Sequence, residues 1–136
     1  MPTREIPYVD LDSEGFWTGC KEGHLRYQYC ETCDHTQFYP RSVCTVCWRE
    51  NDLVWRESAG KGSIYSFTVI HVTFEAGWKE DVPYVVAIVE LDEGFRVMSN
   101  IIGWTDEDEL KVGGRVTVEF DSAQEGLTVP LFRLDA

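Results

Sequence analysis

Four cysteines in two closely spaced pairs constrain the fold of this chain more than any other feature. Each pair has the pattern C-x-x-C, and ten residues separate Cys30 and Cys33 from Cys44 and Cys47. A C-x-x-C turn, or knuckle, aims two sulfur atoms at one point, so two facing knuckles complete a tetrahedral zinc site of the ribbon type. Because protein sulfurs fill all four positions, we expect a structural metal rather than a catalytic one.

Three other roles are open to these cysteines. Two disulfide bonds are disfavoured because a fifth cysteine, Cys20, leaves an odd thiol, and because the lack of a signal peptide predicts a reducing cytoplasm. A thioredoxin-like redox pair requires one C-x-x-C at the start of a helix, whereas both pairs lie in a turn-rich stretch. Iron, as in rubredoxin, uses the same four-sulfur geometry and stays open as an alternative to zinc.

The neighbours of the cysteines give two further expectations. The residue after the second cysteine of a knuckle often has a positive φ, which suits Asp34 but not Trp48, so we expect an irregular second knuckle. His35 adjoins the first knuckle and could hydrogen-bond a metal-bound sulfur.

Composition and charge restrict the class of ligand. The 136 residues, 43% of them hydrophobic, suffice for one or two small units with a core, and the chain has no apolar run of the roughly 20 residues that a membrane helix needs. The formal net charge is −12, and residues 62–136 hold fourteen acidic and five basic residues, a surplus that repels nucleic acid. An anionic ligand such as coenzyme A is met only near the bases of the neutral segment 21–61, namely Arg41, Arg49, Arg56 and Lys61.

Local patterns divide the chain into three parts. Residues 1–24 predict an extended arm over 1–12 and a short helix, capped by Ser13 and ended by Gly23, whose apolar face carries Phe16, Trp17 and Cys20. That face docks either on the rest of this chain or on a partner. Residues 25–58 predict the zinc ribbon with short strands, and the hinge-like Ser-Ala-Gly-Lys-Gly stretch at 58–62 predicts a domain boundary. Residues 59–136 form the third part.

The third part predicts five β-strands. The strand expected over 63–74 changes its apolar phase between residues 69 and 70, which indicates a β-bulge. The strands expected over 84–91 and 95–102 form a hairpin across Asp92-Glu93-Gly94, Thr105 caps an acidic turn, and the last two strands cover 115–120 and 127–134. The chain is therefore expected to be mainly β, with a short helix, a four-cysteine zinc ribbon and a five-stranded OB-fold barrel, the alternative being a small β-sandwich.

No catalytic constellation is evident. The three histidines are isolated in sequence, the acidic run 106–109 lacks the spacing of a cation-binding loop, and no phosphate loop, nucleophile elbow or dinucleotide motif is present. Cys20 is expected to be a buried, inert thiol. Tyr65, Phe67, Trp78 and Tyr84 are candidates for an aromatic platform on the barrel, although barrel filling explains them equally well.

Several segments together resemble a known family. They are FW (16–17), YQYCETC (27–33), FYPR (38–41), CTVC (44–47), GKGSIYSFTV (60–69) and PYVVA (83–87). The chain is similar to the acyl-CoA-associated OB-fold proteins with a rubredoxin-like zinc ribbon, the domain of unknown function thirty-five family. The family often has Gly where this chain has Asp34 and Pro-Pro-Arg where it has Tyr39-Pro40-Arg41, and neither departure removes a metal ligand.

The resemblance implies a function without catalytic residues in this chain. Such proteins are partners of thiolase-like or hydratase enzymes, including steroid side-chain aldolases, so we expect a cytoplasmic accessory subunit in a hetero-oligomer that helps form the partner's acyl-CoA site. Contacts to the partner or to acyl-CoA are expected at Phe16, Trp17, Arg41, Lys61, Tyr65 and Phe67. The alternatives are a nucleic-acid-binding module, opposed by the acidic barrel, and an iron-thiolate electron-transfer protein.

Overall fold

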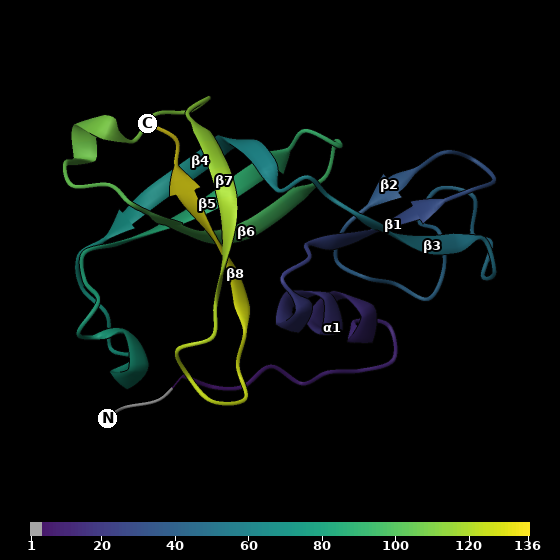
Figure 1. Cartoon of the computed structure of the whole chain (residues 1–136), viewed down its shortest axis with the longest axis horizontal. Coiled ribbons are helices and arrows are strands. Elements are labelled where there is room, and N and C mark those ends of the chain that lie inside the picture. Colours follow the sequence, from purple (N-terminus) through teal and green to yellow (C-terminus); the bar gives the residue numbers. More distant parts are fainter. Residues whose placement is uncertain (1–3) are drawn as a thin grey trace.

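A computed structural model describes residues 4–136 and contains a ribbon sheet, a barrel and one α-helix between them (Figure 1). The expected arm is described from Arg4 onward, and its first three residues lie outside the described range. The ribbon sheet contains β1 (Arg26–Cys30), β2 (Thr36–Gln37) and β3 (Leu53–Glu57) in the order β2-β1-β3. Among residues 4–136, no helix is long and apolar enough to cross a bilayer.

The helix α1 spans Glu14–Glu22 and ends at Gly23, whose φ of 83° is the left-handed conformation expected of a helix-ending glycine. Ser13 precedes the helix, but its side chain does not cap it as predicted. Instead, the Asp10 N–H donates to Ser13 Oγ over 3.2 Å, and the Ser13 N–H donates to Asp10 Oδ1 over 2.8 Å. The hydroxyl therefore fixes the preceding turn of the arm.

The close packing of Gly15 against the Trp55 ring sets the distance between α1 and the ribbon. A β-carbon added to Gly15 would lie 2.3 Å from Cε2 of Trp55 on β3, so only glycine lets the indole pack against the helix backbone. On the same helix, Phe16 and Cys20 are buried in the main hydrophobic cluster. The helix thus contacts its own chain on both sides.

The barrel is closed by five strands in the order β4-β5-β6-β8-β7, with β4 pairing β7. The strands are β4 (Lys61–Ile70), β5 (Tyr84–Leu91), β6 (Arg96–Ile102), β7 (Arg115–Asp121) and β8 (Val129–Leu134). All neighbouring pairs are antiparallel except β6 and β8, which are parallel. This is the expected OB-type Greek-key barrel and not the β-sandwich.

The bulge in β4 lies nearer the start of the strand than predicted. Ile64 pairs with Val89 and Ser66 with Ile88, so the extra residue is Tyr65, which the bulge turns toward solvent. The strand ends at Ile70, whereas the apolar pattern predicted an end at residue 74. Phe74 is 92% exposed in the following loop, which contains the 3-10 helix η1 (Ala76–Trp78). The change of phase therefore marked the end of the strand.

The acidic segment forms the short 3-10 helix η2 (Glu107–Glu109) between β6 and β7. Its cap is Asp106 rather than the predicted Thr105, because the Asp106 side chain accepts from the Asp108 N–H over 2.9 Å. Glu109 Oε1 accepts in return from the backbone N–H of Asp106 over 2.8 Å, which completes a capping box.

One continuous cluster of buried side chains links the helix, the ribbon and the barrel. Phe95, in the β5–β6 turn, stacks on Tyr27 of β1 with ring centroids 4.7 Å apart and on Phe38 of the ribbon at 5.4 Å. Phe38 in turn meets Phe16 of α1 edge to face at 5.3 Å. Four aromatic rings from three parts of the fold therefore form one continuous cluster between ribbon and barrel.

Candidate metal centre

The two knuckles of the ribbon repeat the same backbone hydrogen bonds. The N–H of Asp34 donates to the carbonyl of Cys30 over 2.9 Å, and the N–H of Trp48 donates to that of Cys44 over the same distance. The bonds from Cys30 N to His35 O and from Cys44 N to Arg49 O also correspond. Asp34 and Trp48 have φ of 58° and 65°. The second knuckle is thus as regular as the first, and the expectation that Trp48 distorts it is wrong.

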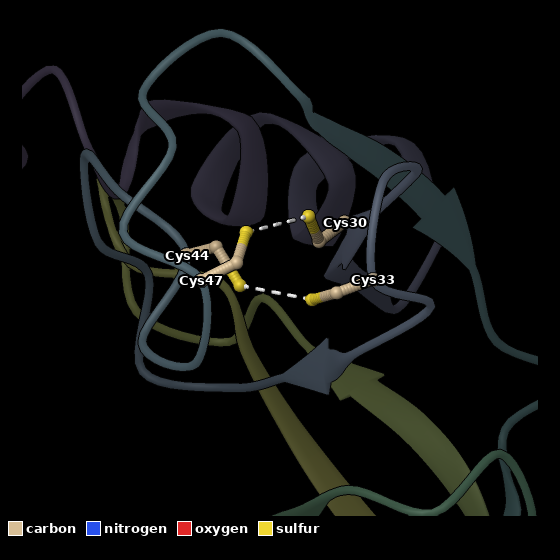
Figure 2. A group of neighbouring side chains, drawn as sticks. All are labelled: Cys30, Cys33, Cys44 and Cys47. Carbon is tan, nitrogen blue, oxygen red and sulfur yellow. Dashed lines mark hydrogen bonds between the residues drawn. The ribbon is translucent and has the colours of Figure 1, made fainter.

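The knuckles bring four sulfur atoms together at the junction of β1 and the following loops (Figure 2). All four lie within 4.8 Å of one another, and the Cys30–Cys47 and Cys33–Cys44 sulfurs are each 3.6 Å apart. Disulfide sulfurs are about 2.05 Å apart, so these thiols are free. Zinc–sulfur bonds of about 2.3 Å place tetrahedral ligands about 3.8 Å apart, so the cluster fits a zinc ion, and iron shares this donor set.

The surroundings of the cluster shift the thiol pKa values of Cys44 and Cys33 in opposite directions. Backbone hydrogen bonding, mainly from the Cys47 N–H, lowers the pKa of the Cys44 thiol to about 6, which favours the thiolate that binds metal. Desolvation raises the pKa of the Cys33 thiol to about 12, although the backbone N–H of His35 acts in the opposite direction. A metal cation would add the charge that keeps this thiol deprotonated. The His35 ring itself contacts Thr45 Oγ1 at 3.1 Å, and not a sulfur as predicted.

Two buried glutamines hold the loop that carries the second knuckle. Gln28 of β1 imitates a β-bridge: its side-chain oxygen accepts from the Arg41 N–H, and its amide donates to the Arg41 carbonyl, each over 2.9 Å. The paired Gln37 of β2 donates to Gln28 Oε1 over 2.8 Å, and its own side-chain oxygen accepts from the Thr45 N–H over 3.0 Å. Nothing in the sequence marked these glutamines, because only the strand register aligns them.

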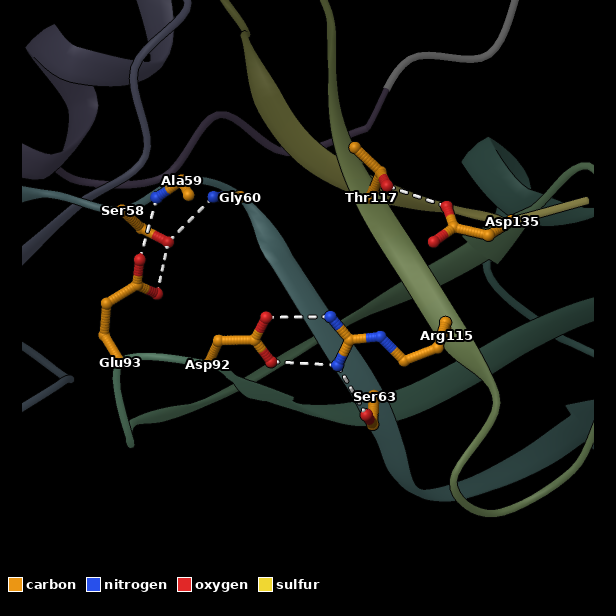
Figure 3. A network of polar contacts seen from close by, with 9 residues as sticks. All are labelled: Ser58, Ala59, Gly60, Ser63, Asp92, Glu93, Arg115, Thr117 and Asp135. Atoms are coloured by element: carbon orange, nitrogen blue, oxygen red, sulfur yellow. Dashed lines mark hydrogen bonds and ion pairs between the residues drawn. The ribbon is translucent and has the colours of Figure 1, made fainter.

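The linker between ribbon and barrel is fixed rather than hinge-like (Figure 3). The carboxylate of Glu93, in the β5–β6 turn, accepts from Ser58 Oγ over 2.7 Å and from the Ala59 N–H over 2.8 Å. Gly60, with φ of 78°, leaves no room for a β-carbon, which would lie 2.4 Å from Val118 Cγ1. Polar groups of Ser58, Ala59 and Gly60 are thus bound, although the composition of residues 58–62 is hinge-like. The division into residues 1–24, 25–58 and 59–136 stays a prediction.

The six predicted contact residues do not gather at one place. Phe16 is 7% exposed within the core, and Trp17 packs edge to face on it while lining an open depression of about 850 Å³ between the arm and α1. Phe67 packs against the barrel interior, whereas Tyr65 is 46% exposed beneath the guanidinium of Arg96, whose Cζ lies 3.8 Å from the ring centroid.

The two predicted cationic residues are both exposed, but their surroundings differ. Lys61 begins β4, and its carbonyl accepts from the Asp92 N–H. Hydrogen bonds from Arg115 lower the pKa of the Asp92 carboxyl group, and the charge of Lys61 lowers it to a lesser degree. Arg41 lies in the loop held by the glutamines, and its side chain makes no ion pair within residues 4–136. Lys61 likewise makes no ion pair among the described residues, but it lies near the Asp92 carboxylate, so Arg41 is the cation more open to an external anion.

A four-cysteine ribbon joined rigidly to a closed OB barrel defines this molecule as a zinc-ribbon/OB-fold protein. Residues 17–53 match the family model of the ChsH2 rubredoxin-like zinc ribbon domain, and residues 55–121 match that of the ChsH2 C-terminal OB-fold domain. The chain belongs to the DUF35 family of zinc-ribbon/OB-fold proteins.

Known relatives support this family membership along most of the chain. A DUF35 domain-containing scaffold protein of Methanothermobacter thermautotrophicus is 38% identical over 71% of this chain and 71% of the relative. The benzoylsuccinyl-CoA thiolase subunit BbsA of Geobacter metallireducens is 30% identical over 68% of this chain and 66% of the relative. A probable enoyl-CoA hydratase alpha subunit of Thermomonospora curvata is 33% identical over 96% of this chain, which spans only 40% of that longer relative.

A solved structure extends the likeness to three dimensions. A chain of the Ltp2-ChsH2(DUF35) aldolase superposes with a TM-score of 0.84 and 32% sequence identity, covering 94% of this chain and 98% of that one. The ribbon, the barrel and their mutual arrangement are thus shared with a chain that was solved as part of an aldolase.

Proposed function

We propose that this chain is a non-catalytic accessory subunit that binds a thiolase-like enzyme and helps form its acyl-CoA site in the cytoplasm. The observation that carries the proposal is the full-length likeness to the DUF35 chain of an aldolase complex. A relative named as a subunit of a CoA-ester thiolase supports the same class of partner. The reaction would belong to the partner, because this chain's metal site is closed by four protein sulfurs.

The metal would have a structural role, which is to hold the two knuckles of the ribbon together. Cys30, Cys33, Cys44 and Cys47 are the residues that would hold it, and zinc is the ion that we propose. When bound, it supplies a fixed four-way crosslink between the two knuckles and no open position for a substrate. The chain's own residues extend this crosslink, since Gln28 ties the knuckle loop to β1 and Phe95 ties β1 to the barrel.

Arg41 is the residue that we propose for contact with the partner or with the phosphates of coenzyme A. It is exposed, and Gln28 fixes its backbone on both sides, so its guanidinium extends from a rigid base. Guanidinium groups recognise phosphates and carboxylates by paired hydrogen bonds. Lys61, Tyr65, Trp17 and Phe67 are weaker candidates, because Lys61 lies near Asp92, Tyr65 is covered by Arg96 and the other two pack against the core.

The nucleic-acid alternative is opposed by the arm. OB-folds bind oligonucleotides on the face of their second and third strands and on two flanking loops, which here are 71–83 and 122–128. Arg4 lies between these loops: its guanidinium donates to the Gly77 carbonyl over 3.1 Å and lies 3.5 Å from the Trp78 ring centroid, while its backbone pairs with the Gln124 side chain. Arg4 of the arm thus bridges the two loops that an oligonucleotide would contact, and acidic residues dominate the barrel.

Co-expression with a candidate thiolase-like enzyme from the same genome tests the proposal. We expect a stable complex on size-exclusion chromatography and lower CoA-ester turnover by the enzyme alone. Separate elution, with the enzyme fully active by itself, would refute the function. Arg41→Glu should reduce complex affinity or turnover, and an unchanged value of both would remove Arg41 from the site while leaving the rest of the proposal intact.

A further inference from the structure

The second knuckle presents an exposed tryptophan in a conformation that a bulky residue rarely adopts. Trp48 has φ of 65°, in the left-handed region that favours glycine and disfavours large side chains. The knuckle imposes this conformation, because the Trp48 N–H must reach the Cys44 carbonyl, 2.9 Å away. Trp48 is 73% exposed, more than any other of the five tryptophans. The indole therefore adds little to the stability of this fold.

Trp48 and its neighbours in sequence form an exposed apolar surface with a cation at its edge. Val46, two residues earlier, is 59% exposed, and Arg49 follows directly. We define these three residues as the second-knuckle surface. The backbone beneath this surface is rigid, because the metal ligand Cys47 lies between Val46 and Trp48. In addition, the Arg49 carbonyl accepts from the N–H of the metal ligand Cys44 over 3.0 Å. A rigid exposed aromatic flanked by an arginine is the usual composition of a binding hot spot.

Charge pairing indicates the chemistry of the partner. The barrel arginines Arg96, Arg115 and Arg133 each meet a carboxylate of this chain. Arg49 contacts Asp52 only at 3.9 Å, the outer limit of an ion pair, and its side chain is 62% exposed. The cation at the second knuckle is therefore left for an external carboxylate, in a chain whose net charge of −12 would otherwise repel an acidic surface.

We propose that the second-knuckle surface, with Trp48 as its anchor, inserts into an apolar pocket with a carboxylate at its rim on the catalytic partner subunit. The inference rests on the proposed function, since that function supplies the partner. It explains why a position suited to glycine holds a solvent-exposed indole. Asp34, the corresponding residue of the first knuckle, is polar and turns its side chain back to the Tyr29 hydroxyl, so the first knuckle has no such anchor.

The conformation of Trp48 gives a test in which binding and folding separate. Trp48→Gly places the favoured residue at φ of 65°, so the zinc-loaded variant should keep its melting temperature while it loses the anchor. We expect its affinity for the same thiolase-like enzyme to fall about 30-fold or more by calorimetric titration, as for a hot-spot tryptophan. Trp48→Phe should retain part of the affinity.

Asp34→Gly is the matched control, because it makes the same backbone change at φ of 58° in the first knuckle. It should leave the affinity unchanged. Equal losses in Asp34→Gly and Trp48→Gly would assign the effect to knuckle geometry and overturn the proposal. Self-association of the free chain that Trp48→Gly abolishes would assign the surface to a second copy and also overturn it.

The outcomes distinguish this inference from the proposed function. If the wild-type chain does not bind the enzyme, both fail. If the wild-type chain binds and Trp48→Gly binds equally well, only the second-knuckle surface is refuted. Loss of binding in Trp48→Gly with retained melting temperature and metal content supports both.

Discussion

The ring of Phe95 stacks on the ring of Tyr27, with centroids 4.7 Å apart and planes inclined by 24°. Tyr27 belongs to the ribbon strand β1, and Phe95 belongs to the β5–β6 turn of the barrel. The same turn supplies Glu93, which binds the linker at Ser58 and Ala59. One turn of the barrel therefore fixes the position of the ribbon through both an apolar and a polar contact.

Truncation of this contact should destabilise the whole chain. Phe95→Ala removes a 3% exposed ring from between Tyr27 and Phe38, and we expect the free energy of unfolding to fall by about 3–5 kcal/mol. Denaturant unfolding of the zinc-loaded chain measures the change. Phe95→Leu keeps most of the volume and should cost only about 1–2 kcal/mol. Wild-type stability in Phe95→Ala would show that the stack does not join the two parts.

Loss of the Gln28 amide should loosen the knuckle loop. Gln28→Leu keeps the size of the side chain but leaves the Arg41 N–H and carbonyl without their partner, which should cost about 1–3 kcal/mol. Zinc affinity, measured by competition with a chromogenic chelator, should fall with it. Gln124→Leu, which removes a glutamine bonded to the arm, should leave zinc affinity unchanged. Equal zinc affinity in Gln28→Leu and the wild type would contradict this role.

The five thiols should fall into two classes of reactivity. A chelator should expose four reactive thiols, those of the cluster, and release about one metal ion per chain. The fifth, Cys20, is 1% exposed, and burial raises its pKa to about 12, so it should react only after denaturation. Thiol titration with metal analysis measures both numbers, and Cys20→Ala should lower only the denatured count. Rapid reaction of five thiols in the folded chain would contradict this assignment.

An ion pair on the barrel should make stability depend on pH in the acid range. Arg115 donates to both oxygens of Asp92, over 2.8 and 2.7 Å, and these hydrogen bonds lower the Asp92 pKa below its ordinary value of 3.8. Because the pKa is lower in the folded state, the stabilisation is complete above the ordinary value and is lost as the pH falls through the folded value. Asp92→Asn should therefore destabilise the chain at pH 7.

The difference between Asp92→Asn and the wild type should shrink steadily as the pH is lowered from 5 to 2. Urea unfolding midpoints across this range measure the effect. Glu125→Gln is a suitable control, because Glu125 is exposed and makes no ion pair or side-chain hydrogen bond within residues 4–136. A difference that stays constant down to pH 2 would assign the destabilisation to something other than the Asp92 charge.

Residue spacing alone was enough to predict the metal cluster, two glycine turns and the strand β7. Each C-x-x-C knuckle brings its own two sulfurs together, and with only ten residues between the knuckles the spacing predicted that Cys30, Cys33, Cys44 and Cys47 converge. The helix end at Gly23 and the hairpin at Gly94 were equally predictable, because a positive φ is a local property of glycine. The apolar alternation of β7 likewise indicated a strand with one face toward the core.

Tertiary structure alone decided how these parts are joined. The pairing of Gln28 with Gln37 depends on strand register, and the contacts of Phe95 and Glu93 join residues more than 30 positions apart. The bulge at Tyr65 was misplaced from the sequence because apolar residues beyond Ile70 suggested a longer strand, although Phe74 is exposed. Trp48 adopts a left-handed conformation because metal-site geometry outweighs local preference. Local preferences fix elements, whereas contacts between distant residues fix their arrangement, and these contacts have no signature in sequence spacing.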